Sequence, residues 1–422
     1  MKLLYVSQYF PPEMGAPAAR AVELARHWVR RGHEVTILTG FPNHPTGIVV
    51  PEYRARMRRL VTRELVDGIR VVRTWLWPRP NRRPRERMLN YSSFFLSASL
   101  TGLFLDCPDV IIATSPQLLV ALSGYWLARC KRVPFVFEVR DLWPESLTAV
   151  GVGDSHSALH RVLAAIAGFL YRNSDHIVVV TPAFRAHLVK GWRVPEEKIS
   201  VVENGVETDL FAPSSADHMR AELGFEGKFV VCYTGTIGMA HGLATLVDAA
   251  EQLSQSLPDV VFLLVGEGAE KQRIMELAAA RRLANIRFLD QQPREKIPGI
   301  ISASDACLVL LKKTDVFKTV IPTKMLEFMA CERPVILGVD GQARALLEKA
   351  GAGIFVEPEN ASALADAVTS LHCQPELRSS YGKNGRRFIL QHLSRERTAL
   401  EYLALLDSLL HGEANLAIAA AR

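Results

Sequence analysis

The stretch QYFPPEMGAPAARAVELARHWVRRGHEVTIL, residues 8–38, contains one complete connection between two strands. An apolar run from the N-terminus ends here in a loop rich in proline and glycine, and apolar residues at helical spacing follow that loop. The segment RGHEV then turns into a second β-branched run. Parallel strands are usually joined by helical crossovers of this kind, so the stretch predicts a strand–helix–strand unit in a parallel sheet.

The same alternation continues along the whole chain. Short apolar runs, separated by stretches with helical patterning, occupy residues 2–8, 34–40, 69–75, 109–115, 134–140, 175–181, 199–204, 228–235, 260–268, 286–291, 306–311, 333–339 and 353–358. Thirteen strands are too many for one comfortable sheet, and the polar segment 204–219 is the natural break. We therefore expect an α/β protein with two doubly wound, Rossmann-like domains, whose ligands bind in the cleft between them at the carboxyl ends of the strands. The expected boundaries are residues 1–205, residues 206–390, and a helical segment 391–422 that crosses back to the first domain.

The composition is that of a soluble globular protein, with 422 residues, 49% hydrophobic and 22% charged. The N-terminus MKLLYVSQYF has the character of a first strand and lacks the pattern of a secretory signal. The six cysteines are scattered without a CxxC pair, which indicates free, mostly buried thiols in a reducing compartment. We therefore expect a cytoplasmic protein.

The net charge of +6 is unevenly distributed. Residues 51–87 contain twelve arginines and only four acidic residues, which predicts either a patch for an anionic partner or a solvated, arginine-rich loop. The uncharged segment 88–105 follows directly. We expect it to form a helix on the first sheet, with a helix lying in the membrane interface as the alternative and a transmembrane span as the least favoured interpretation.

Candidate site residues in the first half follow two of the expected strands. Gly15 lies between a strand and a helix, where it lets the backbone approach a ligand whose phosphate meets the helix N-terminus. Arg140 and Asp141 follow the run 135–139 and would face the ligand crevice, unless they only lock the loop as an ion pair. His156 and His160 have helical spacing but no carboxylate nearby in sequence, so we expect no metal site there.

The second half contains two glycine-rich turns of the same kind. Gly235 and Gly238 precede a helix and are suited to wrapping a diphosphate, with His241 as either a phosphate donor or a neutral cap. The turn Gly266-Glu267-Gly268 follows the next strand.

The stretch IPTKMLEFMACERPVIL, residues 321–337, carries a further candidate pair. Lys324 lies in the first turn of an expected helix, where both the helix dipole and its own charge favour an anion. Glu327, three residues later, projects from the same face and would suit a pair of hydroxyls such as those of a ribose. Without further information, Glu327 is equally well explained as a residue that stabilises the helix dipole.

The chain resembles the retaining glycosyltransferases of family 4, which have the GT-B fold, over nearly its whole length. The resemblance rests on residues 11–40, 201–213, 233–249, 263–274 and 321–337, taken together and in this order. Residues 40–47, 138–146 and 321–330 are most similar to the WbuB-like branch, whose members are associated with transferring N-acetylated deoxyaminosugars during O-antigen or capsule assembly.

The resemblance implies roles for individual positions. Gly15 and Ala16 correspond to the first loop, which contacts the donor diphosphate and the acceptor, and Glu327 corresponds to the glutamate that binds the donor ribose. Pro322, Thr323 and Lys324 belong to the same donor site.

The sequence departs from the family pattern at four positions. Arg140 stands where the family usually has histidine, and Thr236 and His241 stand at the usual arginine and lysine positions. Thr319 replaces the first glutamate of the Glu-x7-Glu motif. Lys324 and Arg140 would then offset the diphosphate charge, with Lys312 and Lys313 as weaker candidates.

The resulting functional hypothesis is transfer of a sugar from a UDP-sugar to a sugar acceptor, with retention of configuration and without a metal or other cofactor. A polyprenyl-diphosphate-linked acceptor would explain a membrane-facing surface near Arg79, Arg82, Arg83, Arg85 and Arg87, at the inner face of the cytoplasmic membrane. A non-catalytic nucleotide-sugar-binding partner and a non-hydrolysing UDP-sugar 2-epimerase are the alternatives. Nucleic acid is not expected as a partner, because the basic segment lacks interleaved readout motifs.

Overall fold

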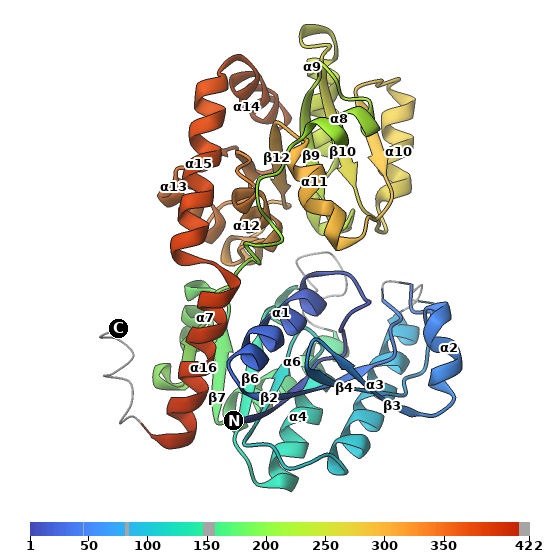
Figure 1. Ribbon diagram of the computed structural model, residues 1–422, viewed down its shortest axis with the longest axis vertical. Coiled ribbons are helices and arrows are strands. Elements are labelled where there is room, and N and C mark those ends of the chain that lie inside the picture. Colours follow the sequence, from blue (N-terminus) through green and yellow to red (C-terminus); the bar gives the residue numbers. More distant parts are fainter. Residues whose placement is uncertain (45, 81–83, 147–156, 413–422) are drawn as a thin grey trace. The chain divides into compact units, whose positions relative to one another are not determined.

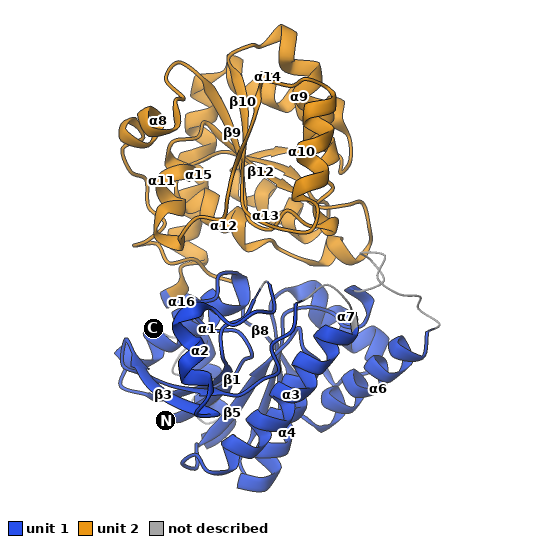
Figure 2. Ribbon diagram, turned by 90° about the vertical axis from the view of Figure 1, so that its right-hand side faces the viewer, with its two compact units in different colours: residues 1–203, 396–422 blue, residues 204–395 orange. Residues whose placement is uncertain are grey.

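The computed structural model describes residues 1–44, 46–80, 84–146 and 157–412. The chain forms two compact units, with unit 1 comprising Met1–Glu203 and Glu396–Arg422 and unit 2 comprising Asn204–Arg395 (Figure 2). Each unit contains one sheet covered by helices on both faces, so the expected α/β class with two Rossmann-like domains is confirmed (Figure 1). His156, Arg82 and Arg83 lie outside the described residues.

The sheet of unit 1 has the strand order β3-β4-β2-β1-β5-β6-β7-β8. Its strands are β1 (Lys2–Val6), β2 (Glu34–Gly40), β3 (Val61–Val66), β4 (Ile69–Thr74), β5 (Val110–Thr114), β6 (Phe135–Val139), β7 (His176–Val179) and β8 (Ile199–Val201). All neighbours pair in parallel except β3, which runs antiparallel to β4 at the sheet edge. All seven strands expected in this half are present.

Strand β3 was not predicted from the sequence, where it lies inside the arginine-rich segment. Its sequence VTRELV alternates apolar and polar residues, and no side chain in it is fully buried. Such a half-exposed edge strand lacks the continuous apolar run by which the central strands were recognised. The interpretation of residues 51–87 as a solvated loop is therefore wrong, because the segment also contains α2 (Pro51–Met57) and β4.

One arginine of this segment belongs to the interior. Arg73 is fully buried, and its Nε lies 2.6 Å from the Glu64 carboxylate while its guanidinium also donates to the carbonyl of Pro11. Arg56 pairs with the same carboxylate at 3.3 Å. Part of the local positive charge is thus neutralised within unit 1.

The helices of unit 1 cover opposite faces of the sheet. They are α1 (Ala16–Arg30), α3 (Pro84–Leu103), α4 (Leu118–Lys131), α6 (Ala158–Asn173), α7 (Pro182–Trp192) and α16 (Arg395–His411), with a 3-10 turn, η1 (Glu196–Lys198). Helices α1 and α16 share one core cluster with β1, β2, β4 and β5 (Figure 1). Among the described helices, none is both long enough and apolar enough to cross a bilayer.

Helix α3 covers the expected segment 88–105 and packs against β2, β4 and α4. Its side chains Asn90, Phe94 and Ala98 are buried, as expected for a helix on the first sheet. The opposite face of α3 is exposed.

Unit 2 has an all-parallel sheet in the order β11-β10-β9-β12-β13-β14. The strands are β9 (Phe229–Thr234), β10 (Val260–Val265), β11 (Ile286–Leu289), β12 (Ala306–Leu310), β13 (Val335–Gly338) and β14 (Gly353–Phe355). All six strands expected here are present. Strands β9, β10, β12 and β13 are buried throughout, as coverage of both faces requires, whereas the edge strands β11 and β14 are only partly buried.

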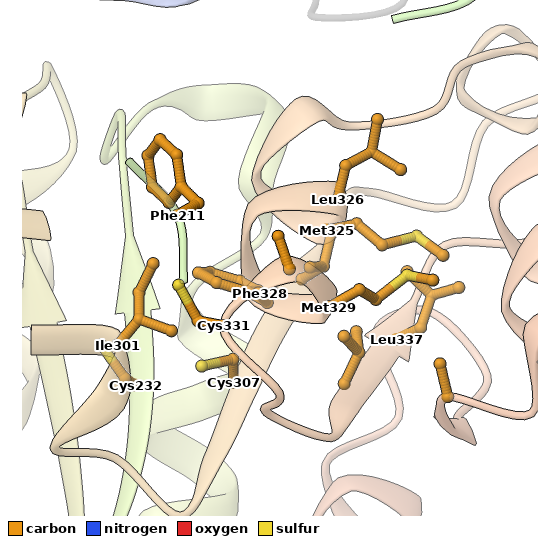
Figure 3. Packing of buried hydrophobic residues seen from close by; sticks show 14 of the residues in the cluster. Phe211, Cys232, Ile301, Cys307, Met325, Leu326, Phe328, Met329, Cys331 and Leu337 are labelled. Carbon is orange, nitrogen blue, oxygen red and sulfur yellow. The ribbon is translucent and has the colours of Figure 1, made fainter. Parts of the chain in front are cut away.

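The helices of unit 2 are α8 (Asp217–Leu223), α9 (Ala244–Ser256), α10 (Lys271–Ala280), α11 (Ile297–Ser302), α12 (Thr323–Ala330), α13 (Gln342–Ala350), α14 (Ala361–Cys373) and α15 (Pro375–His392), with 3-10 turns η2 (Met239–His241), η3 (Arg294–Lys296) and η4 (Val316–Thr319). Helix α12 is anchored by Met325, Phe328 and Met329, which lie in the core beside Cys232 and Cys307 (Figure 3). This anchoring holds the N-terminus of α12 at a constant position on the sheet.

The six cysteines are all free. Cys232, Cys307 and Cys331 are buried as expected, whereas Cys107, Cys130 and Cys373 are exposed. The expectation that the thiols are mostly buried is therefore wrong for half of them, since Cys107, Cys130 and Cys373 lie at or beyond helix ends.

Candidate active site

Two loops interlock at the carboxyl edge of the unit 2 sheet. The loop after β9 and the loop after β10 exchange backbone hydrogen bonds, with Gly235 N donating to Val265 O at 2.9 Å and Ile237 N to Glu267 O at 2.8 Å. Glu270 N in turn donates to Ile237 O at 3.0 Å. The two glycine-rich turns singled out in the sequence therefore form one rigid surface.

Gly266 and Gly268 are required by this loop contact. A Cβ atom on Gly266 would lie 2.0 Å from the Gly235 carbonyl oxygen, and one on Gly268 would lie 2.2 Å from the Ile237 carbonyl oxygen. Both separations are far below van der Waals contact, so only glycine fits. These two glycines thus allow the backbones of the two loops to pack against each other.

Lys324 lies in the first turn of α12 and points toward the loop after β9. Its Nζ lies 3.9 Å from the centroid of the Tyr233 ring, and a Cβ on Gly235 would come within 2.9 Å of the same atom. Among the described residues, no hydrogen-bond partner is found for this buried ammonium group. Burial lowers the pKa of Lys324 to about 7, and the nearby Glu327 only partly opposes that shift.

The chemical consequence is a cationic position that is suited to an anion. Burying an ammonium group without a partner costs free energy, and an anion placed beside it removes that cost. The first backbone N–H groups of α12, like those of any helix, have no acceptor within the helix and favour negative charge at its N-terminus. The head of α12, with Pro322 as its cap and Thr323 as its first residue, is therefore suited to a diphosphate.

Glu327 lies one turn further along α12 and is paired with Arg294. The Arg294 guanidinium donates to Glu327 Oε1 at 3.1 Å, and the guanidinium carbon lies 5.0 Å from the centroid of the Phe211 ring. Only 16% of the Glu327 side chain is exposed. Arg294 thus holds the Glu327 carboxylate in one orientation.

Arg294 was not predicted from the sequence as a site residue. Arg294 follows β11 in the segment Asp290-Gln-Gln-Pro-Arg294, beyond the end of a strand. The rule that singled out Arg140, namely a charged residue past a strand's carboxyl end, would have found it as well.

His241 lies in this site as an uncharged residue. Burial and the neighbouring Lys324 ammonium lower the pKa of His241 to about 3. Its Nδ1 lies 3.3 Å from the Gly238 carbonyl oxygen, so the ring braces the loop after β9. Of the two alternatives for His241, the structure favours the neutral, structural one.

The remaining expected residues of unit 2 are engaged within the fold. The Thr236 carbonyl accepts a hydrogen bond from Tyr233 at 2.6 Å, and the Thr319 hydroxyl donates to Val316 O at 2.6 Å. Glu267 accepts from Lys271 at 2.6 Å. Lys313 pairs with Glu357 at 2.6 Å and is therefore neutralised, which leaves Lys324 as the better cation for an anionic ligand.

In unit 1, Gly15 is the N-cap of α1 and has φ 133°. A Cβ atom there would find open space, with Pro17 Cδ at 3.8 Å as its nearest neighbour, so the Gly15 side leaves room for a ligand. Ala16 is the first residue of the helix. The pair is thus placed where a helix N-terminus faces the carboxyl edge of the sheet.

Arg140 and Asp141 follow β6 and are held by Ser115. The Ser115 hydroxyl accepts from the backbone N–H of Arg140 at 2.7 Å and from that of Asp141 at 3.2 Å. The Asp141 carboxylate accepts from Ser146 Oγ and, at 3.3 Å, from Trp143 Nε1. Burial raises the pKa of Asp141, and these donors offset only part of the shift. Asp141 therefore locks the loop.

A buried polar cluster at the same edge of unit 1 was also missed. Glu13 accepts backbone hydrogen bonds from Phe10, Asn43 and His44, and burial raises its pKa to about 7. Gln8 donates to Asn90 Oδ1 at 2.6 Å. Glu13 could not be predicted as a buried residue, because neither periodicity nor spacing in the sequence distinguishes a buried carboxylate from a solvated one.

A metal site in a protein needs several histidine, cysteine or carboxylate side chains close together. In the parts of the chain that the structure describes, no three of them lie close enough together to hold an ion.

Two family models together match most of the chain. Residues 15–205 match the model described as glycosyl transferase 4-like domain, and residues 215–388 match the model described as glycosyl transferases group 1. The two matches correspond to the two units of the structure.

Individual proteins show the same likeness along the full length. WcaI of Escherichia coli strain K12, named for colanic acid biosynthesis, is 24% identical over 420 residues, which is 96% of this chain and 99% of WcaI. Sucrose-phosphate synthase of Thermosynechococcus elongatus has a TM-score of 0.77 at 21% identity. The match covers 97% of this chain and 98% of the synthase chain. HepE of Anabaena, solved with UDP-glucose, has a TM-score of 0.72 at 18% identity, with 97% of this chain and all of HepE covered.

Proposed function

Because the chain belongs to the family 4 glycosyltransferases of GT-B fold, which use nucleotide sugars, we propose that it transfers a sugar from a UDP-sugar to a hydroxyl of a second sugar. The observation that carries the proposal is the buried Lys324 ammonium, which has no hydrogen-bond partner among the described residues and lies at the head of α12. A leaving diphosphate would supply the missing negative charge.

The donor binds in unit 2. Lys324 and the N-terminus of α12 hold the diphosphate, and negative charge that develops on it as the glycosidic bond breaks is stabilised there. Glu327, oriented by Arg294, accepts hydrogen bonds from the ribose hydroxyls. The uridine base is proposed because HepE, which shares the fold, was solved with UDP-glucose.

The acceptor binds at the carboxyl edge of unit 1, near Gly15, Ala16 and Arg140. Arg140 supplies positive charge for a charged acceptor group. Configuration is retained by attack on the same face that the leaving group departs from, so no carboxylate nucleophile is needed. Side chains neutralise the phosphates, so the reaction proceeds without a metal or other cofactor.

The transferred sugar is an N-acetylated amino sugar, and the acceptor is a polyprenyl-diphosphate-linked sugar at the inner face of the cytoplasmic membrane. The resemblance of residues 321–330 to the WbuB-like branch supports the amino sugar. The name of WcaI supports a place in the assembly of a cell-surface polysaccharide such as O-antigen or capsule.

The proposal is tested by incubating the purified chain with individual UDP-sugars and a lipid-linked GlcNAc acceptor, with products identified by mass spectrometry. Lys324→Met is expected to lower kcat/KM by about 100-fold or more, as loss of one charge-stabilising donor does. Lys313→Met is the matched control, since Lys313 follows a neighbouring strand of unit 2 but already pairs with Glu357, and its activity should stay near wild type.

A second candidate is a non-catalytic nucleotide-sugar-binding partner, which the uncharged Thr319, Thr236 and His241 favour. UDP binding without transfer of any donor to any acceptor would support that candidate and contradict the proposal. A free, epimerised nucleotide sugar formed without an acceptor would instead identify a UDP-sugar 2-epimerase.

A further inference from the structure

Exposed apolar side chains gather on one part of unit 1. Of the nineteen large hydrophobic residues that are exposed in the described part of the chain, five lie on α3, one directly follows it, one lies on α4 and three lie on α6. Unit 2, which is of similar size, exposes three. A random scatter of surface apolar residues would not divide in this way, and such concentrations mark interaction surfaces.

Helices α3, α4 and α6 lie side by side on one face of unit 1 (Figure 2). Ser99 of α3 donates to Ser123 of α4 at 3.1 Å, and a Cβ on Gly102 would meet the Leu127 side chain. The rings of Tyr125 on α4 and Phe169 on α6 meet edge to face, with their centroids 5.1 Å apart. The three helices therefore form one continuous face, which we call the three-helix face.

The exposed side chains of α3 form a single stripe. Leu89, Leu96, Leu100 and Leu103 follow one another at intervals of seven, four and three residues and are 46%, 60%, 61% and 37% exposed. That spacing places all four on one side of a helix, over a length of about 21 Å. Phe104, directly after the helix, is 83% exposed and extends the stripe.

The other two helices continue the apolar surface with larger rings. Trp126 of α4 is exposed, as are Leu159, Val162 and Phe169 of α6. Leu159, Val162 and Phe169 are again spaced to share one side of their helix. Indole rings are favoured where an apolar layer meets water, because they combine apolar area with an N–H donor.

The charges that the three helices themselves carry are almost all positive. The sequences of the three helices contain six lysines and arginines and one acidic residue, Glu86. Because each helix joins two parallel strands of the same sheet, all three run in the same direction, with their first turns at the carboxyl edge. Arg85, Arg87 and Arg161 lie in the first turns, and Arg129 and Arg172 lie in the last turns.

The arrangement is an apolar centre between two basic rims. Lys131 belongs to the internal structure, because its ammonium donates to the carbonyls of Leu103 and Leu105. A second copy of the chain docked on this face would bring basic residues against basic residues, with little acidic charge to offset them. Phosphate head groups above an acyl layer match both the charge and the apolar centre.

We infer that the three-helix face docks on the surface of an anionic phospholipid bilayer, with the α3 leucines, Phe104 and Trp126 inserted at the head-group level and the arginines on lipid phosphates. This inference rests on the proposed function, because a lipid-linked acceptor gives membrane docking its purpose. Docking on the bilayer itself requires neither the UDP-sugar nor the acceptor. The inference keeps Arg85 and Arg87 of the expected membrane-facing surface and adds α4 and α6, whereas Arg73 is buried and Arg56 pairs with Glu64.

Docking through this face places the bilayer near the edge of unit 1 where the acceptor is proposed to bind. Asn90, on the buried side of α3, accepts a hydrogen bond from Gln8 at the end of β1 and donates to the carbonyl of Trp77 at 3.1 Å. The basic rim of Arg85 and Arg87 lies in the preceding turn of the same helix. A lipid head group held by this rim would therefore lie close to the edge where the acceptor sugar is proposed to bind.

The test is co-sedimentation of the purified full chain with vesicles of phosphatidylcholine, with or without phosphatidylglycerol, in the absence of donor and acceptor. The wild type should bind the anionic vesicles, more weakly as salt rises. Leu96→Ser combined with Leu100→Ser should lower the bound fraction at least tenfold, and Arg85→Gln with Arg129→Gln should remove the preference for anionic lipid. Met239→Ser with Met275→Ser, two exposed apolar residues of unit 2, is the matched control and should bind as the wild type does.

Three outcomes would overturn the inference: no binding of the wild type, equal binding of the leucine variant, or a dimer in solution that the leucine variant converts to monomer. Each is separate from failure of the proposed function. A water-soluble sugar diphosphate acceptor should be turned over by the leucine variant at the wild-type rate, so loss of docking and loss of transfer are measured independently.

Discussion

At the residue scale, the decisive feature is a lysine whose ammonium is buried without a hydrogen-bond partner within the described residues. The Tyr233 ring face gives it some stabilisation at 3.9 Å, but a ring does not replace water or an anion. Such a group is unfavourable in the free protein and becomes favourable only when a ligand brings negative charge. Lys324 is therefore better explained by binding than by stability.

This placement predicts how UDP binding depends on pH. Burial lowers the pKa of Lys324 to about 7, so in the free protein the ammonium loses its proton as the pH rises through about 7. A bound diphosphate favours the charged form, so binding takes up a proton above that pH and the affinity for UDP should fall, by at most about tenfold per pH unit.

Isothermal titration calorimetry between pH 6 and 9, in buffers of different ionisation enthalpy, measures both the affinity and the proton uptake. Lys313→Met should show the wild-type pH profile, whereas Lys324→Met should bind UDP weakly and lose the proton uptake above pH 7. A flat affinity for the wild type over this range would contradict the assignment.

At the element scale, the site depends on two strand-to-helix loops whose backbones are in direct contact. Gly266 is the residue that permits this contact, since a methyl group there would overlap the Gly235 carbonyl. The loop after β9 also determines the position of the Tyr233 ring and His241 around Lys324. Loop packing and ligand binding are thus linked through the same few backbone atoms.

Gly266→Ala should destabilise unit 2 by about 3 kcal/mol or more, because the backbone has to move to relieve the overlap. Gly227→Ala is the control, with a positive φ of 68° but nothing within 4 Å of the added atom, and it should cost about 1–2 kcal/mol. Urea unfolding followed by circular dichroism compares the two. A cost for Gly266→Ala no greater than that for Gly227→Ala would show that the loops separate easily.

At the scale of the whole molecule, the last helix of the chain completes the core of the first unit. Helix α16 packs on α1, where the Tyr402 ring meets the Trp28 ring edge-on at 5.4 Å and the Trp28 indole donates to the Ala399 carbonyl at 3.1 Å. The same region of unit 1 contains the buried pair of Arg20 and Glu138, 2.9 Å apart. Burial alone would raise the pKa of Glu138, but Arg20 and Arg140 outweigh it and hold the carboxylate charged.

Tyr402→Ala should therefore destabilise unit 1 by about 3–5 kcal/mol, as removal of a fully buried aromatic ring does. Tyr402→Phe should be neutral or slightly stabilising, since the hydroxyl has no hydrogen-bond partner within the described residues. Differential scanning calorimetry with and without UDP separates the units, because UDP should shift only the transition of unit 2. Equal destabilisation by both substitutions would show that the hydroxyl is needed.

The α/β class, the thirteen parallel strands and the candidate position of Lys324 were predictable from the amino-acid sequence. They were predictable because a strand buried on both faces must be apolar throughout, and because a parallel sheet directs its loops to one edge. The tertiary structure was needed to show which candidates are charged and lack a hydrogen-bond partner, since burial and pairing depend on residues far apart in the chain. It revealed Arg294 beside Glu327, the neutral state of His241 and the role of Asp141 in locking a loop. It also found β3, whose alternating pattern is that of an edge, and it showed that the exposed leucines of α3 continue onto α4 and α6. No local pattern contains that information, because a surface is assembled from helices that only the fold brings together.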